Sequence, residues 1–236
     1  MKQNLKNKTL VAIILISLVF ISCTTNDPAV KLPTSPEAIV AYDASSAGII
    51  KGILVGSTGN FKFSIKNGND SIYCKVTFDG NTGTLISTDF QSWIPGQAIN
   101  RAKFTGKVGT TDVVVYLSCG ADGSNTSVEF SIPGHTVVVS VIKETSTSLV
   151  KGYEGTYSTY DLKTNVKKYD GTFNFITKNG FVIGYHKGTD GSGEFEGTIS
   201  GNKLTIDADI LDIDDATVSG TLIGDSKIVV SGKRTL

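Results

Sequence analysis

The sequence predicts an all-β protein made of two tandem antiparallel meander units, each a small barrel or a sandwich, that follow a signal peptide and a linker. Glycine is abundant (26 residues) and proline is sparse (5 residues), a composition that suits short strands joined by tight turns. Hydrophobic residues recur with a period of two, as in Phe61, Phe63 and Ile65, and no part of the body alternates at helical spacing. Turn dipeptides separate these runs: Asn67-Gly68, Asp79-Gly80, Asp122-Gly123, Asn179-Gly180, Asp190-Gly191 and Gly201-Asn202.

The first 22 residues have the pattern of a secretory signal peptide. Three lysines precede an apolar run from Leu10 to Ile21, and the small residue Ser22 follows directly. An apolar run of this length is too short to span a bilayer as a helix, which needs about 20 residues. Residues 1–22 are therefore expected to be removed from the mature protein.

Cys23 directly follows this small residue, and the combination resembles the lipid box of bacterial lipoproteins. The resemblance implies cleavage before Cys23, attachment of lipid such as palmitate to it, and a membrane partner reached through that anchor. Thr24 rather than Asp follows, which implies the outer membrane of the cell envelope. The alternative is an ordinary secretory peptide with a cysteine nearby by chance.

Residues 23–45 are predicted to form a flexible linker. The segment is polar, contains Pro28, Pro33 and Pro36, and lacks periodicity until Ile39. An open alternative is that Ile39 and Val40 begin a strand that packs on the first unit.

The charge of the mature chain excludes one class of partner. Because residues 1–22 contain three lysines and no acidic residue, the remaining 214 residues carry 19 basic and 22 acidic side chains. No basic surface for nucleic acid is expected from this balance.

The body reads as two copies of one unit, at 46–147 and 148–236. Three pairs of short segments match in the same order: residues 61–68 with 173–180, 104–108 with 195–199, and 137–140 with 228–231. A period near 100 residues is too long for a solenoid and indicates two tandem domains. The first copy has extra residues between Gly68 and Phe104, and this insertion contains Trp93, the single tryptophan of the chain.

The remaining cysteines, Cys74 and Cys119, both lie in the first copy. Outside the cytoplasm an even pair favours a disulfide, and the alternative is two buried free thiols. Neither cysteine has a second ligand at zinc-binding spacing, so no metal site is expected there.

No catalytic motif or cofactor fingerprint is present, and we expect a non-enzymatic protein without a cofactor. The two histidines, His135 and His186, have no partner motif. The acidic residues between Asp207 and Asp215 lack the spacing of a calcium loop and are expected on the wet side of a strand and in a turn.

Aromatic residues are the candidate binding residues. Tyr153 and Tyr157 share one face of a strand, and Phe90 and Trp93 lie in the insertion, where loops often carry function. Exposed rings of this kind can form a platform for a sugar or a protein partner. The alternative is that they fill the interior of a small barrel.

The glycine-punctuated pattern after residue 150 (Gly155-Thr-Tyr157, Gly171-Thr-Phe173, Gly197-Thr-Ile199 and Gly220-Thr-Leu222) resembles calycin-type, lipocalin-like meander barrels. The resemblance implies a possible internal cavity, although the G-x-W start of true lipocalins is missing. The expected function is a non-catalytic binding module for an apolar small molecule, a glycan or an envelope partner. The alternative is a structural or assembly scaffold of the outer envelope.

Overall fold

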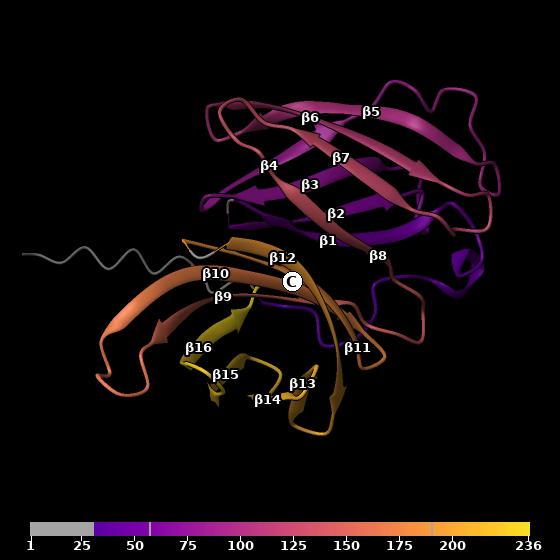
Figure 1. The fold of residues 1–236 in the computed structure, drawn as a ribbon. Coiled ribbons are helices and arrows are strands. Elements are labelled where there is room, and N and C mark those ends of the chain that lie inside the picture. The colour runs from indigo at the N-terminus through magenta and orange to yellow at the C-terminus, as the bar shows by residue number, and fades with distance from the viewer. Residues whose placement is uncertain (1–30, 57, 190) are drawn as a thin grey trace, which may run out of the picture. The chain divides into compact units, whose positions relative to one another are not determined.

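The computed structural model describes residues 31–236 except 57 and 190, and it is an all-β structure (Figure 1). The predicted fold class, two tandem antiparallel units, is confirmed. The first unit contains β1 (Gly48–Val55), β2 (Gly59–Ile65), β3 (Ile72–Phe78), β4 (Asn81–Ile86), β5 (Ile99–Val108), β6 (Thr111–Cys119), β7 (Ser127–Ser131) and β8 (Val138–Lys143). The second contains β9 (Lys151–Tyr160), β10 (Lys167–Lys178), β11 (Phe181–Gly188), β12 (Gly191–Ser200), β13 (Lys203–Ile206), β14 (Asp209–Ile213), β15 (Thr217–Ile223) and β16 (Lys227–Arg234).

Strands β1–β8 form a curled sheet, called here the first sheet, in the order β7-β6-β5-β4-β3-β2-β1-β8. Its edge strands β7 and β8 contact each other without forming a ladder, so the sheet is nearly closed (Figure 1). The predicted alternation holds within it: on β2, Phe61, Phe63 and Ile65 are buried in the core enclosed by the sheet. The hairpin turn at Asp79-Gly80 has positive φ at both residues, as the turn dipeptide predicts.

Strands β9–β16 form a closed barrel, called here the barrel, in which β16 pairs with β9. Consecutive strands are neighbours throughout, and the tight turn at Asn179-Gly180 again has positive φ at both positions. The choice between barrel and sandwich is thereby settled for this unit: it is an up-and-down antiparallel barrel.

The two units share one topology, because the first strand of each lies between the second and the eighth. A local feature repeats as well. A Cβ placed on Gly52 of β1 would lie 2.2 Å from the Phe61 ring and 2.5 Å from the Ser140 carbonyl oxygen. The barrel repeats this arrangement with Gly155, Phe173 and Ser231. The tandem repeat inferred from sequence thus has a structural counterpart in the strands that close each unit.

One of the three sequence matches is misplaced. Residues 61–68 and 173–180 fall on β2 and β10, and residues 137–140 and 228–231 on β8 and β16, which are equivalent strands. Residues 104–108 lie on β5, however, whereas 195–199 lie on β12, and the counterpart of β5 is β13. Patterns as short as F-x-G recur on non-equivalent strands, because the inward face of every strand needs apolar and small residues.

Residues 204–210, which alternate as if they formed one strand, instead form a hairpin. Asp207 has φ of 52° and begins a turn between β13 and β14. The turn changes which residues face inward, so Leu211 is buried while Ile210 is exposed. The alternation continued through the turn by coincidence and could not reveal it.

The described part of the expected linker is not free. Residues 37–46 lie against the first sheet and include a short 3-10 helix, η1 (Val40–Tyr42), rather than a strand. Glu144, which is fully buried, accepts hydrogen bonds from the amides of Glu37 (2.7 Å), Ala38 (3.3 Å) and Val150 (2.9 Å). This carboxylate therefore fastens the N-terminal segment and the start of the second unit to the same point.

Lys51 completes this cluster on the outer face of β1. Its ammonium lies 2.7 Å from Glu144 and 3.0 Å from Glu37, and its side chain is fully buried. Lys62, directly opposite on β2, contacts the other oxygen of Glu37 at 2.7 Å. Glu37 thus separates two like charges that would otherwise face each other across the strands.

The first sheet and the barrel belong to one compact body, Leu32–Leu236. The expected boundary at 147/148 lies in the connection between β8 and β9. Over the described residues, no helix is long and apolar enough to cross a membrane. The signal peptide, Cys23 and the first part of the linker lie outside the described residues.

Candidate functional site

The interiors of the two units differ in how completely they are filled. In the first sheet, large side chains from every strand meet in one core, and most of them are fully buried. Phe63 contacts Phe104 edge to face with ring centroids 5.0 Å apart, and Phe61 lies 5.0 Å from Phe130. The space enclosed by the first sheet is therefore filled by side chains, as in an ordinary protein core.

Phe90 and Trp93 belong to this core, which corrects the expectation that they form an exposed platform. The insertion between β4 and β5 folds inward, so Trp93 is 9% exposed and packs edge to face on Phe90 at 5.3 Å. Phe90 in turn lies 5.7 Å from Phe104, and the Trp93 indole donates to the carbonyl of Gln97 at 3.1 Å. The loop buries these two rings against the apolar end of the sheet, whereas its Ile94 is 58% exposed.

The barrel encloses an open space of about 360 Å³, called here the barrel cavity. Its walls are mainly apolar and aromatic, and several inward-facing side chains, such as Ile206 and Leu222, remain partly exposed. The lining comprises Tyr157, Thr159, Phe173, Phe175, His186, Glu194, Phe195, Leu204, Ile206, Asp207, Asp209, Leu211, Leu222, Ile228 and Val230. The barrel is therefore closed by its strands and hollow at one end.

Glycines in the wall explain why the aromatic rings leave this space open. A Cβ on Gly155 would lie 2.5 Å from the Phe173 ring, and one on Gly184 would lie 2.4 Å from the Phe195 ring. Each ring therefore occupies the position that a neighbouring side chain would fill and lies against the wall. A third pair of this kind is Gly171 and Tyr157. Rings held at the wall contribute apolar surface without filling the axis of the barrel.

Phe175 forms the floor of the cavity, and the ring of Tyr153 stacks behind it. Tyr153 and Phe175 stack with centroids 4.9 Å apart and an interplanar angle of 14°. The Tyr153 hydroxyl donates to the carbonyl oxygen of Asp214 at 2.9 Å, and burial raises the pKa of Tyr153 to about 12. Tyr153 is thus a neutral structural residue, whereas Tyr157, four residues further along β9 and on the same face, lines the cavity itself.

Polar side chains gather towards the open end of the cavity. Thr159 on β9 is 5% exposed, and its hydroxyl has no hydrogen-bond partner among the described residues. His186 on β11 packs edge to face against Tyr157 at 6.1 Å. Asp209 lies on the inward-facing side of β14, two positions from buried Leu211, and is exposed at the mouth. The site combines an apolar body with a small polar rim, the usual composition of a small-molecule pocket.

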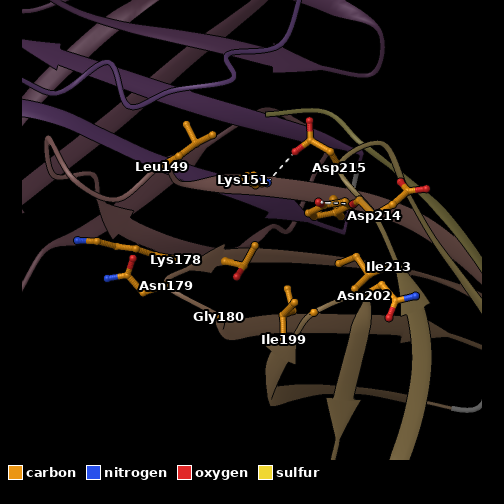
Figure 2. A pocket seen from close by; sticks show the side chains of 13 residues that line it. Leu149, Lys151, Lys178, Asn179, Gly180, Ile199, Asn202, Ile213, Asp214 and Asp215 are labelled. Atoms are coloured by element: carbon orange, nitrogen blue, oxygen red, sulfur yellow. Dashed lines mark hydrogen bonds and ion pairs between the residues drawn. The ribbon is translucent and has the colours of Figure 1, made fainter.

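The opposite end of the barrel has a second pocket of about 370 Å³ (Figure 2). Its charged groups already have partners within the protein. Lys151 lies 2.6 Å from Asp215, the Asp214 carboxylate accepts the amide of Thr217 at 2.6 Å, and Lys178 donates to a backbone carbonyl at 2.9 Å. Figure 2 shows the Lys151–Asp215 pair across one side of this pocket. The hydrogen bonds there close turns and strand ends, so we consider the barrel cavity the better candidate site.

The expected disulfide is not present: Cys74 and Cys119 are free, buried thiols. They lie on β3 and β6, which β4 and β5 separate, a path of roughly 14 Å along the sheet at about 4.8 Å per strand. A disulfide needs Cα atoms within about 7 Å. Burial raises the pKa of both thiols, and the Cys119 sulfur accepts a hydrogen bond from Thr126 at 3.3 Å. The two residues are core side chains.

Of the four aromatic candidates, the structure brings only Tyr157 to the barrel cavity, with Tyr153 behind its floor. Thr159, His186 and Asp209 also line the cavity, although the sequence did not single them out as binding residues. The parity of β9 could have indicated Thr159, since it shares a face with Tyr153 and Tyr157. In comparisons with known proteins, the chain matches no family model, no curated protein and no solved structure.

Proposed function

We propose that the protein is a lipid-anchored, non-catalytic binding module of the cell envelope whose barrel cavity holds one small, largely apolar molecule. The single observation that carries this proposal is the contrast between the filled first sheet and the hollow barrel, two units of the same topology. A protein core normally leaves few voids larger than a water molecule, so a space this large requires a reason.

The dimensions of the cavity suit a small ligand. Eight-stranded barrels have room for side chains alone or for one small ligand. The volume of about 360 Å³ lies within the range of roughly 300–1,000 Å³ found for small-molecule pockets. Aromatic walls without a dense hydrogen-bonding lining favour an apolar molecule over a glycan, which would need polar contacts to each of its hydroxyls.

A lipid anchor is supported by the predicted signal peptide, residues 1–22, together with Cys23. Lipid on this residue would hold the body at a membrane surface, where apolar molecules concentrate. Labelling cells with a radioactive fatty acid tests this part of the proposal. Incorporation that is lost in Cys23→Ser supports it, and an unlabelled wild-type protein contradicts it.

Binding is tested with a naphthylmethanol, a neutral bicyclic alcohol, titrated into isotopically labelled protein and followed by NMR. The variant Ile206→Trp places a large ring in the cavity, whereas Ile210→Trp places the same ring on the 57% exposed outer side of the adjoining strand. We expect saturable binding to the wild type, at least tenfold weaker binding to Ile206→Trp, and unchanged binding to Ile210→Trp. Absence of saturable binding, or equal losses in both variants, would contradict the proposal.

A further inference from the structure

We propose that the barrel cavity binds molecules built on a planar aromatic ring system in preference to saturated molecules with the same carbon skeleton. This inference rests on the proposed function, because it names the chemical class of the apolar ligand. Two observations carry it. The cavity has one aromatic and one aliphatic wall, and in the first sheet phenylalanine rings fill the corresponding space.

The lining of the cavity is divided between two halves of the barrel. Among the described residues, every aromatic side chain that lines it, histidine included, belongs to β9–β12: Tyr157, Phe173, Phe175, His186 and Phe195. Every aliphatic side chain that lines it belongs to β13–β16: Leu204, Ile206, Leu211, Leu222, Ile228 and Val230. Each half consists of four consecutive strands of the closed barrel, so an aromatic wall faces an aliphatic wall across the cavity.

The rings of the aromatic wall contact one another. Phe173 and Phe175, at successive inward positions of β10, have planes only 9° apart, with centroids separated by 6.2 Å. Phe195 meets Phe175 edge to face, at 66° and 6.4 Å. The tip of the Phe173 ring occupies the place that a side chain at Gly155 of β9, or at Gly232 of β16 beyond it, would fill. A ligand in the cavity therefore meets aromatic rings along this side.

In the first sheet, rings from the opposite side fill the corresponding space. The inward-facing phenylalanines of β2 correspond to those of β10, since the two strands are equivalent. Each has a ring partner across the interior: Phe61 contacts Phe130 of β7, and Phe63 contacts Phe104 of β5, both with centroids 5.0 Å apart. The strands equivalent to β7 and β5 are β15 and β13, which belong to the aliphatic wall of the barrel.

The rings of β10 therefore lack the partners that their counterparts on β2 have. The four strands of the aliphatic wall contain no aromatic residue, so they supply no ring to Phe173 or Phe175. Three of their inward-facing side chains, Ile206, Leu222 and Ile228, remain partly exposed. The cavity occupies this place, and an aromatic ligand there would make the ring contacts that phenylalanines of β5 and β7 make in the first sheet.

These contacts distinguish an aromatic ligand from a saturated one. An aromatic pair contributes more than its buried area accounts for, by roughly two- to tenfold in affinity. The aliphatic wall does not discriminate, because dispersion contacts with its methyl groups are available to either ligand. A saturated ring system with the same skeleton is larger and more apolar, so burial alone would favour it. With two ring contacts in the cavity, we expect a preference of about tenfold for the aromatic ligand.

Two probes that differ only in saturation test the inference: naphthylmethanol and decahydronaphthylmethanol. Each is titrated by NMR into the full, isotopically labelled protein. We expect naphthylmethanol to bind the wild type about tenfold more tightly than the saturated probe. Phe173→Leu keeps the wall apolar but removes one of its rings. In this variant the two affinities should lie within about threefold of each other.

Phe61→Leu is the matched control, because it makes the same substitution at the equivalent position of the first sheet, whose interior is filled. It should leave the preference intact. If Phe173→Leu does not fold, Phe195→Leu repeats the test at a partly exposed position of the same wall.

The possible outcomes separate the inference from the proposed function. If the wild type binds both probes equally, or binds the saturated probe better, the inference is overturned while the proposed function stands. If neither probe binds, both fail. An undiminished aromatic preference in the folded wall variant also overturns the inference, because the rings of the wall are then not its source. A preference lost equally in Phe61→Leu has the same meaning.

Discussion

Replacing Lys51 with methionine tests how the buried charge cluster holds the chain together. The Lys51 and Glu144 side chains are both fully buried, with their charged atoms 2.7 Å apart. Methionine preserves most of the volume of the lysine side chain and removes the charge. The variant leaves the Glu144 carboxylate buried with backbone amides as its remaining partners.

The expected loss of stability follows from this burial. Removing one member of a buried ion pair costs about 3–5 kcal/mol, because the remaining charge stays desolvated and uncompensated. The amides of Glu37, Ala38 and Val150 still donate to Glu144, so we expect the lower end of this range, about 3 kcal/mol. Such a loss is a large part of the 5–15 kcal/mol by which domains are typically stable.

Lys62→Met provides the matched control, since Lys62 is the cross-strand neighbour of Lys51 and shares its partner Glu37. The Lys62 and Glu37 side chains are 24% and 34% exposed, and ion pairs that solvent reaches contribute at most about 1 kcal/mol. Urea unfolding followed by the fluorescence of Trp93 measures both variants, because this single tryptophan lies in the core of the first sheet. Equal losses in the two variants, or a loss below about 1 kcal/mol in Lys51→Met, would refute the reasoning.

Two further predictions concern the first sheet. Trp93→Ala should lower the free energy of unfolding by about 3–5 kcal/mol, measured by circular dichroism in urea, because it removes a buried ring. Naphthylmethanol binding in the barrel should not change. A loss of binding without a loss of stability would contradict this and indicate that Trp93 contacts the ligand. Burial acts to raise the pKa of Glu37, but hydrogen bonds and charges from Lys62 and Lys51 outweigh it and lower this pKa below that of an ordinary glutamate. The wild type should therefore be more stable than Glu37→Gln at neutral pH, and the difference should disappear as the pH falls through the lowered pKa. A pH-independent difference in urea unfolding would contradict this.

Local signals in the sequence predicted the fold class well. Positive φ at Asp79-Gly80 and Asn179-Gly180 requires residues that tolerate it, so these dipeptides identified two hairpins directly. Alternation along β2 likewise identified the buried face, because side chains in a strand point alternately to its two sides. Both signals depend on residues adjacent in the chain, which is why sequence alone could reveal them.

The candidate site depended on contacts that adjacent residues cannot reveal. Whether a phenylalanine fills a barrel or lies along its wall depends on the neighbouring strand: the tip of the Phe195 ring occupies the place that a side chain at Gly184 would fill. Trp93 is buried because a twelve-residue connection, 87–98, folds back onto the end of the sheet. The free state of Cys74 and Cys119 follows from the strand order, which the spacing of cysteines does not encode.

The docking of the N-terminal segment onto the body also sets how far the body can move from a membrane. If Cys23 carries the lipid, the free tether ends near Pro33, whose carbonyl oxygen accepts a hydrogen bond from the Arg234 guanidinium, and not at residue 45. At about 3.5 Å per residue, the contour length falls from nearly 80 Å to about 35 Å. The hollow barrel would then sample only a shallow layer above the bilayer, within reach of amphiphiles that leave its surface.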